Sequence, residues 1–278
     1  HPKVKSVITT NHRSWKKNIF STSLINELRS IKSRLNNTNY DAVIDMQNNL
    51  KSAAISFFIK NAVHGLDKQS AREYPSHLAY KFTYEIPKKN HAISRQRRLL
   101  ALSLNYELNT EDIDYGIKHD KFERPNLELP DKFLFLVHNA SWPTKMWSIP
   151  RWQELIRLIN SEGYMALLPS GSIEEFERAQ EIASISTDAL AIPAQSLNRT
   201  AYIIKNSAGC ICSDTGLAHL SAILGKPSVT MYSVTDEKLI GTRGNNQTHI
   251  ISSDSEMDSI TSQRAWEELK ILIGTGGG

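Results

Sequence analysis

A short segment of the chain combines residue types that suit the binding of a phosphorylated ligand. Residues 213–219 read Ser-Asp-Thr-Gly-Leu-Ala-His, and they end an apolar stretch that begins at Gly209. We expect this stretch to form a strand and a helix to begin at Thr215. The first amides of a helix have no partners within it, and the helix dipole favours negative charge there, so this turn suits a phosphate or diphosphate. Gly216 would let an anion approach the backbone, and Asp214 could accept a hydrogen bond from a sugar hydroxyl.

The same segment has a second interpretation that involves no ligand. Asp214 or Thr215 can cap the N-terminus of the helix, and His219, one turn inward, can be a packed core histidine. Caps of this kind are common, and the local sequence leaves both interpretations open.

Two more charged side chains follow expected strands. Lys145 lies in the loop after residues 133–137, where a lysine can neutralise phosphate charge. Glu175 follows the Pro-Ser-Gly turn at 169–171, where a carboxylate can bind a ribose hydroxyl. A solvated lysine, and an acidic residue placed favourably in the first turn of a helix, explain both positions without any ligand.

Several function classes are disfavoured by motifs that the chain lacks. It contains no Walker A motif, no G-x-G-x-x-G, no G-x-S-x-G and no H-E-x-x-H. Its two cysteines, Cys210 and Cys212, fall on one face of an expected strand without the further ligands that a metal site needs. No run of about 18 apolar residues is present. We therefore expect a globular protein without a resident metal or membrane-spanning helix.

Charge is distributed unevenly along the chain. The net charge is +4, yet residues 1–105 contain 18 Lys and Arg against 6 Asp and Glu. A basic first part suggests an anionic partner, which could be a nucleic acid, a phosphorylated ligand or an acidic membrane surface. It can equally be a solvated charged face. No helix-turn-helix, zinc-finger spacing or RNA-binding aromatic strand accompanies the basic residues, which disfavours a nucleic acid.

These residues must be positioned by alternating strands and helices. The expected strands are residues 4–8, 40–45, 62–65, 133–137, 165–168, 189–192, 209–213 and 228–232. The expected helices are residues 21–35, 49–59, 92–104, 150–160, 172–182, 196–205, 215–224 and 260–273. Residues 67–90 are expected to form a long loop.

Strand–helix alternation predicts an α/β fold with parallel sheets covered by helices. The polar, proline-containing stretch 107–131 predicts a linker between two Rossmann-like domains that face each other across a cleft. The first would cover residues 1–122 and the second 131–254, with a C-terminal helix within 255–274 packing back on the first. Ligands bind at the carboxyl ends of parallel strands, which places the expected site in the cleft.

Several segments, in their common order, resemble glycosyltransferase family 9, the lipopolysaccharide heptosyltransferases. The matching segments are 40–47 (YDAVIDMQ) with 51–54, 64–67 with 71–73, 145–147 with 152–156, 168–171 with 175–179, 214–219 (DTGLAH), and 235–236 with 239–241. The resemblance implies a GT-B fold whose second domain holds most of the nucleotide sugar.

The resemblance also implies a reaction and its setting. The reaction is inverting transfer of L-glycero-D-manno-heptose from ADP-heptose to a Kdo hydroxyl of Kdo2-lipid A, with no cofactor and no metal required. The enzyme would be cytoplasmic and would bind peripherally to the anionic inner membrane, which suits a basic first domain.

Roles for individual residues follow from the matched motifs. Lys145 and Asp214 are the expected catalytic residues, with Lys145 stabilising the charge of the diphosphate. The expected donor-binding residues are Ser141, Lys145, Glu175, Asp214, Thr215, Gly216 and His219. The expected acceptor-binding residues are Arg13, Lys16 and Arg72.

The chain departs from the family pattern in two ways. Family members begin with a strand and a Gly-Asp loop whose aspartate is the expected general base, whereas this chain begins at His1 without that segment. We therefore expect an incomplete first domain, a base upstream of residue 1, and little or no transfer by the chain as given. Ala140, Ser170 and Gln195 also differ from the usual residue types, which bears on nucleoside selectivity.

Three other functions remain open. The acceptor could be a heptose, as in another branch of the family, although the matches at 64–73 and 145–147 favour the Kdo acceptor. The protein could be a non-catalytic module that binds a sugar nucleotide or an anionic lipid. It could also bind nucleic acid through its basic part, in which case duplex binding would depend strongly on salt.

Overall fold

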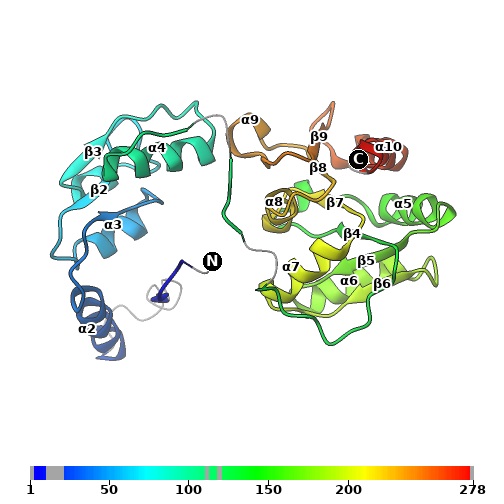
Figure 1. The fold of residues 1–278 in the computed structure, drawn as a ribbon, viewed down its shortest axis with the longest axis horizontal. Coiled ribbons are helices and arrows are strands. Elements are labelled where there is room, and N and C mark those ends of the chain that lie inside the picture. The colour runs from blue at the N-terminus through cyan, green and yellow to red at the C-terminus, as the bar shows by residue number, and fades with distance from the viewer. Residues whose placement is uncertain (1–2, 11–21, 110–112, 118–120, 276–278) are drawn as a thin grey trace. The chain divides into compact units, whose positions relative to one another are not determined.

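The computed structural model describes residues 3–10, 22–109, 113–117 and 121–275 (Figure 1). The chain divides into two units, residues 1–112 and 113–278. The boundary therefore lies earlier than the expected limits of 122 and 131. Much of the expected linker belongs to the second unit, because Ile117, Phe122, Leu127 and Leu129 pack against a buried cluster there.

The first unit is built around a short parallel sheet in the order β1-β2-β3. Its strands are β1 (Val43–Ile44), β2 (Val63–Leu66) and β3 (Phe82–Tyr84). Its helices are α2 (Thr22–Asn36), α3 (Leu50–Ser56), the 3-10 turn η1 (Ser76–Ala79) and α4 (Ala92–Leu104). Leu66, Ala71, Ile86 and Leu99 form its small buried core.

Two expectations for this unit are wrong. Residues 3–10 are described and contain no strand, so the expected strand at 4–8 is absent. The expected loop at 67–90 contains η1 and β3. Two of the three residues of β3 are exposed, so no apolar run marks it in the sequence.

A buried aspartate organises the first unit. Asp45 accepts hydrogen bonds from the amides of Gln47 and Asn48 at 2.9 Å and from the Tyr80 hydroxyl at 2.7 Å. The Tyr80 ring lies so close to Gly65 that a Cβ at this position would collide with it. Burial and the neighbouring Asp45 raise the pKa of Tyr80 well above its ordinary value.

The second unit contains a six-stranded parallel sheet in the order β6-β5-β4-β7-β8-β9. The strands are β4 (Phe133–Val137), β5 (Met165–Pro169), β6 (Ala189–Ile192), β7 (Gly209–Ser213), β8 (Ser228–Tyr232) and β9 (Gln247–Ile251). The chain order reverses between β4 and β7, and this is where a doubly wound sheet binds its ligands.

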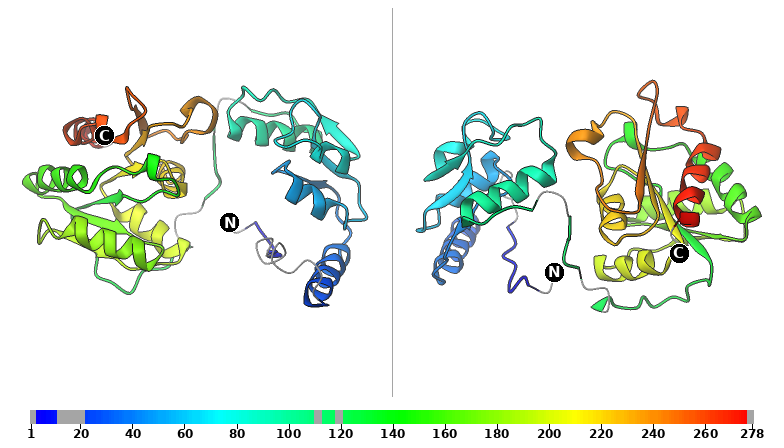
Figure 2. Two further views of the ribbon diagram at one scale, coloured as in Figure 1. Left: turned by 180° about the vertical axis from the view of Figure 1, so that it is seen from behind. Right: turned by 45° about the horizontal axis from the view of Figure 1, so that its top comes forward.

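Helices cover both faces of this sheet (Figures 1 and 2). The helices are α5 (Ile149–Ser161), α6 (Ile173–Ala183), α7 (Leu197–Asn206), α8 (Gly216–Ile223), the short α9 (Glu237–Ile240) and α10 (Ser262–Thr275), with 3-10 turns η3 (Pro143–Lys145) and η4 (Met257–Ser259). Side chains of β4 alternate between the two faces. Leu134 and Leu136 join the core under α5, α6 and α10, while Phe133 and Phe135 join the core under α7 and α8.

The C-terminal helix packs within the second unit. Ala265, Trp266 and Leu269 of α10 are buried in the core of the second unit, where α10 lies beside α5 (Figure 1). Its expected packing on the first unit stays a prediction. The edge strand β9 was also missed, since its Gln-Thr-His start is polar.

Candidate functional site

A pocket of about 510 Å³ opens at the carboxyl ends of the central strands of the second unit. Its lining includes the ends of β4 and β5 at Val137 and Pro169, and the start of α8 at Thr215 and Gly216. It lies at the topological switch point between β4 and β7. Of the predicted donor-binding residues, four line it: Ser141, Glu175, Thr215 and Gly216.

The N-terminus of α8 is not closed by a side chain. Thr215 occupies the N-cap position with extended backbone, yet its side chain makes no capping hydrogen bond, and its Oγ1 is buried without a partner. The side chain of Asp214 is engaged elsewhere. The capping interpretation therefore does not account for these two residues. The first amides of α8, at the positive end of the helix dipole, lie on the side of the pocket.

The predicted pair of Lys145 and Asp214 forms an ion pair. Lys145 Nζ lies 2.6 Å from Asp214 Oδ2, and the two side chains are 21% and 9% exposed. Lys145 comes from the turn after β4 and Asp214 from the end of β7, which lie next to each other in the sheet. The Thr235 hydroxyl donates to the same Oδ2 at 2.6 Å. A cation is thus held at the residue that immediately precedes the N-cap of α8.

Glu175 lies in the first turn of α6, after β5, and lines the pocket. Its Oε2 accepts a hydrogen bond from the Gly171 amide at 2.7 Å. Ser172 caps α6 by accepting from the Glu175 amide. This holds the carboxylate at the pocket wall, where an oxygen can accept a hydrogen bond from a ligand hydroxyl.

His219 lies one turn into α8, half-buried and outside the pocket lining. Burial lowers its pKa, and the negative charge of Asp214 opposes that shift. The histidine is therefore close to the ion pair, in keeping with its predicted place behind the helix start.

Sequence reasoning missed His138, the residue directly after β4. Its side chain is fully buried, and its Nε2 lies 3.0 Å from the Pro169 carbonyl at the end of β5. A carbonyl only accepts, so Nε2 carries the proton. This bond ties together the two strand ends that form the floor of the pocket. Burial, together with the charge of Arg178, lowers the pKa of His138 to about 4, and the Pro169 contact only partly opposes it.

The depressed pKa of His138 predicts an acid-sensitive fold. Well above pH 6.5, the His138 ring is neutral in both the folded and the unfolded protein. As the pH falls toward 4, the unfolded form binds a proton that the folded form rejects, so the unfolding free energy decreases. Between pH 7.5 and 4.5 this one residue should remove about 2 to 3 kcal/mol.

Urea unfolding at several pH values, compared with His138→Gln, checks this. The glutamine keeps a nitrogen donor for the Pro169 carbonyl but does not titrate. The variant should lose about 2 to 3 kcal/mol less over the same range. Equal losses in both proteins would contradict the assignment.

The loop that carries Lys145 is anchored on both sides of it. The Ser233 hydroxyl donates to the Thr144 carbonyl at 2.6 Å. Trp147 Nε1 donates to the Ile260 carbonyl at 3.0 Å, and Arg178 donates to the Trp147 carbonyl at 2.7 Å. Lys145 thus sits between fixed points one residue before it and two residues after it.

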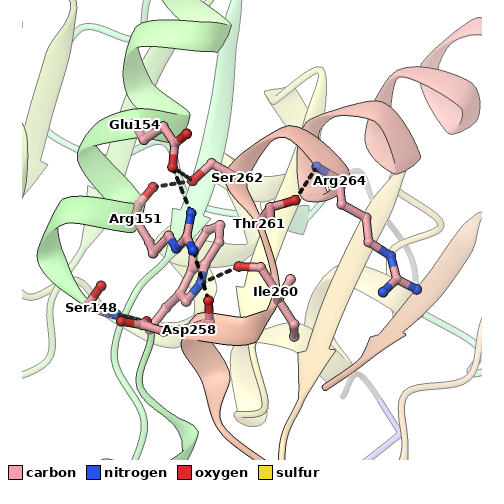
Figure 3. A network of polar contacts seen from close by, with 9 residues as sticks. Ser148, Arg151, Glu154, Asp258, Ile260, Thr261, Ser262 and Arg264 are labelled. Carbon is pink, nitrogen blue, oxygen red and sulfur yellow. Dashed lines mark hydrogen bonds and ion pairs between the residues drawn. The ribbon is translucent and has the colours of Figure 1, made fainter. Parts of the chain in front are cut away.

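The segment before α10 supplies the outer part of this anchor (Figure 3). Asp258 Oδ1 accepts from the Ser148 amide at 2.9 Å, and Arg151 donates to the Asp258 carbonyl at 3.1 Å. The Ser262 hydroxyl lies 2.8 Å from both the Arg151 carbonyl and Glu154 Oε2. These contacts join the start of α5 to the start of α10.

The predicted acceptor-binding residues belong to the first part of the chain. Arg72 is exposed, and its amide donates to the Asn48 carbonyl at 3.1 Å. Arg13 and Lys16 lie outside the described residues. Their role stays a prediction.

Metal-ligating clusters and membrane spans are both absent from the described ranges. No group of three or more His, Cys, Asp or Glu side chains there is placed to hold a metal ion. Within the same ranges, every helix is too short or too polar to cross a membrane.

Comparison with known proteins gives a consistent result. The model of glycosyltransferase family 9 (heptosyltransferase) matches residues 28–270. Lipopolysaccharide heptosyltransferase 1 of Pseudomonas aeruginosa is 35% identical over 251 residues, which is 90% of this chain and 70% of that protein.

Solved structures agree with this match. The Escherichia coli heptosyltransferase WaaC with ADP superposes with a TM-score of 0.89 and 33% identity, covering 98% of this chain and 85% of that one. The complex of the same enzyme with ADP-2-deoxy-2-fluoro heptose gives 0.87 and 32%, covering 98% and 84%.

Proposed function

Because the chain belongs to glycosyltransferase family 9, we propose that it transfers a heptose from ADP-heptose to the inner core of lipopolysaccharide. The observation that carries this proposal is the Lys145–Asp214 pair next to the uncapped start of α8. The first residues of α8, Gly216 and Leu217, line a pocket of about 510 Å³, although Lys145 and Asp214 themselves do not line it. The two WaaC complexes, which contain ADP and an ADP-heptose analogue, support the choice of donor.

The geometry supports a mechanism for departure of the ADP leaving group. An acceptor hydroxyl attacks the anomeric carbon with inversion, its proton passes to a general base, and the bond to the diphosphate breaks. Negative charge then grows on the diphosphate, where Lys145 and the first amides of α8 stabilise it. Glu175 binds the ribose at the other end of the pocket. We propose that this charge stabilisation requires no metal ion.

We propose that the acceptor is a Kdo hydroxyl of Kdo2-lipid A. The matches at 64–73 and 145–147 favour this acceptor over a heptose. Such an acceptor is anionic and lies in the inner membrane. The excess of 18 basic over 6 acidic residues within 1–105 suits reversible binding at its cytoplasmic face.

Thermal unfolding with nucleotides tests the donor site. ADP and ADP-heptose should each raise the midpoint by several degrees, because ligand at about 100 times Kd adds roughly 2.7 kcal/mol to the folded state. UDP and GDP should raise it much less. Equal shifts with all three nucleoside diphosphates would contradict an adenosine site.

A transfer assay separates the enzyme from a binding module. ADP release in the presence of ADP-heptose and Kdo2-lipid A supports the transferase, and release only with a heptosylated acceptor supports the other branch of the family. ADP-heptose binding without transfer to either acceptor, even by a chain extended upstream with the family's N-terminal strand and Gly-Asp loop, would favour a non-catalytic module.

A further inference from the structure

Asp214 Oδ2 accepts hydrogen bonds from two side chains, Lys145 and Thr235. The proposed mechanism uses Lys145 but not Thr235. We propose that the second, Thr235, is a positioning residue that keeps Asp214 in place when Lys145 leaves it for the diphosphate of the donor. This inference rests on the proposed function, because it needs an anion that competes with Asp214 for Lys145.

The three side chains come from three separate loops. Lys145 follows β4, Asp214 follows β7 and Thr235 follows β8. Both Lys145 Nζ and Thr235 Oγ1 lie 2.6 Å from Asp214 Oδ2. Within the described part of the chain, these are the side-chain donors that Asp214 has. A threonine hydroxyl has a single proton to donate, so that of Thr235 is committed to this carboxylate.

Lys145 cannot neutralise two anions fully at once. As charge develops on the leaving diphosphate, the lysine must turn toward it and away from Asp214. The Asp214 side chain is only 9% exposed, so water replaces the lysine poorly. A nearly buried carboxylate that loses its partner is costly unless another donor remains. The Thr235 hydroxyl is that donor, and it also fixes the carboxylate rotamer beside the start of α8.

The same stretch of chain holds the other member of the pair. Ser233, which is nearly buried, donates to the Thr144 carbonyl, immediately before Lys145. Two hydroxyls separated by a single residue therefore set the backbone of Lys145 and the side chain of Asp214. The exposed Val234 between them contributes little packing, so hydrogen bonding carries the contact.

Thr235→Val and Thr235→Ser, made in a chain extended upstream by the family's N-terminal strand and Gly-Asp loop, test this directly. Valine keeps the shape of threonine without the hydroxyl, whereas serine keeps the hydroxyl. Thr235→Val should lower kcat/KM for ADP-heptose about 10- to 100-fold, as expected for a lost hydrogen bond to a charged group. The loss should fall mainly on kcat, because Lys145 moves furthest in the transition state. The Kd for ADP should also rise, and Thr235→Ser should stay within about threefold of the wild type.

A matched control removes a buried hydroxyl from the amino end of β7, the strand that Asp214 follows. Ser207 precedes β7, and its hydroxyl donates to the Ile204 carbonyl at 2.8 Å. Ser207→Ala should therefore leave kcat and the ADP Kd unchanged.

The outcomes separate the inference from the proposed function. Wild-type behaviour of Thr235→Val, or equal losses in the valine and serine variants, would overturn the positioning role while leaving the transferase intact. A wild-type protein that neither binds ADP nor transfers heptose would overturn the proposed function and this inference with it. Serine rescue together with a kcat-dominated loss in the valine variant supports it.

Discussion

Replacing Lys145 by alanine lowers kcat for heptose transfer by about 100- to 1,000-fold, the loss expected when one preorganised group that stabilises transition-state charge is removed. Lys145 is held 2.6 Å from Asp214. Asp214 is the residue directly before the N-cap of α8. The diphosphate gains negative charge as the sugar leaves, and no other lysine is paired with a strand-end carboxylate in the described part of this unit. Initial rates of ADP release from ADP-heptose, with acceptor present, measure the effect in a chain extended upstream by the family's N-terminal strand and Gly-Asp loop.

A second lysine beside the same strand provides the control. Lys132 precedes β4, at the amino end of this strand, and its Nζ donates to the Glu162 carbonyl. Lys132→Ala should leave kcat within about twofold, since an exposed contact of this kind contributes little. Lys145→Arg should recover only part of the rate, because the planar guanidinium does not reproduce a point charge. A Lys145→Ala variant that keeps more than about a tenth of the wild-type rate would contradict the assigned role.

The central strands of the second unit could be predicted from the sequence. Residues 133–137, 209–213 and 228–232 are continuous apolar or small stretches, and all three match observed strands residue for residue. A parallel strand buried on both faces produces such a run. The edge strand β9 and the three-residue β3 have polar or exposed positions, so pairing with their neighbours, rather than local pattern, defines them.

The site could be predicted only as a set of positions. Asp214 and Lys145 each follow a strand, which is why the sequence indicated them. Their 2.6 Å contact joins residues 69 apart in the chain and depends on β4 and β7 being neighbours. Thr235 fell within a matched segment but had no assigned role, because its contact with Asp214 exists only after the sheet forms. His138 is one polar residue at a strand end, and only its burial reveals its function.

Replacing Trp147 by alanine should lower the unfolding free energy by about 3 to 5 kcal/mol, the usual cost of emptying a buried tryptophan site. Trp147 is fully buried and packs edge-on against Trp152, with ring centroids 5.1 Å apart. Its Nε1 also satisfies the buried carbonyl of Ile260. Urea unfolding followed by circular dichroism measures the loss. Trp142, in the same loop, is 67% exposed, so Trp142→Ala should change stability by less than about 0.5 kcal/mol.

Trp147→Phe distinguishes packing from anchoring. Phenylalanine keeps most of the contact with Trp152 but cannot donate to Ile260, which should cost about 1 to 3 kcal/mol for an unsatisfied buried carbonyl. Lys145 lies only two residues earlier. This variant should therefore lower kcat by more than the decrease in the folded fraction of the protein explains. Full kcat in a folded Trp147→Phe protein would show that Ser233 and Arg178 alone hold the loop. Reduced kcat would show that the contact of Trp147 with Ile260, in the core beneath α5 and α10, also positions the lysine that neutralises the leaving group.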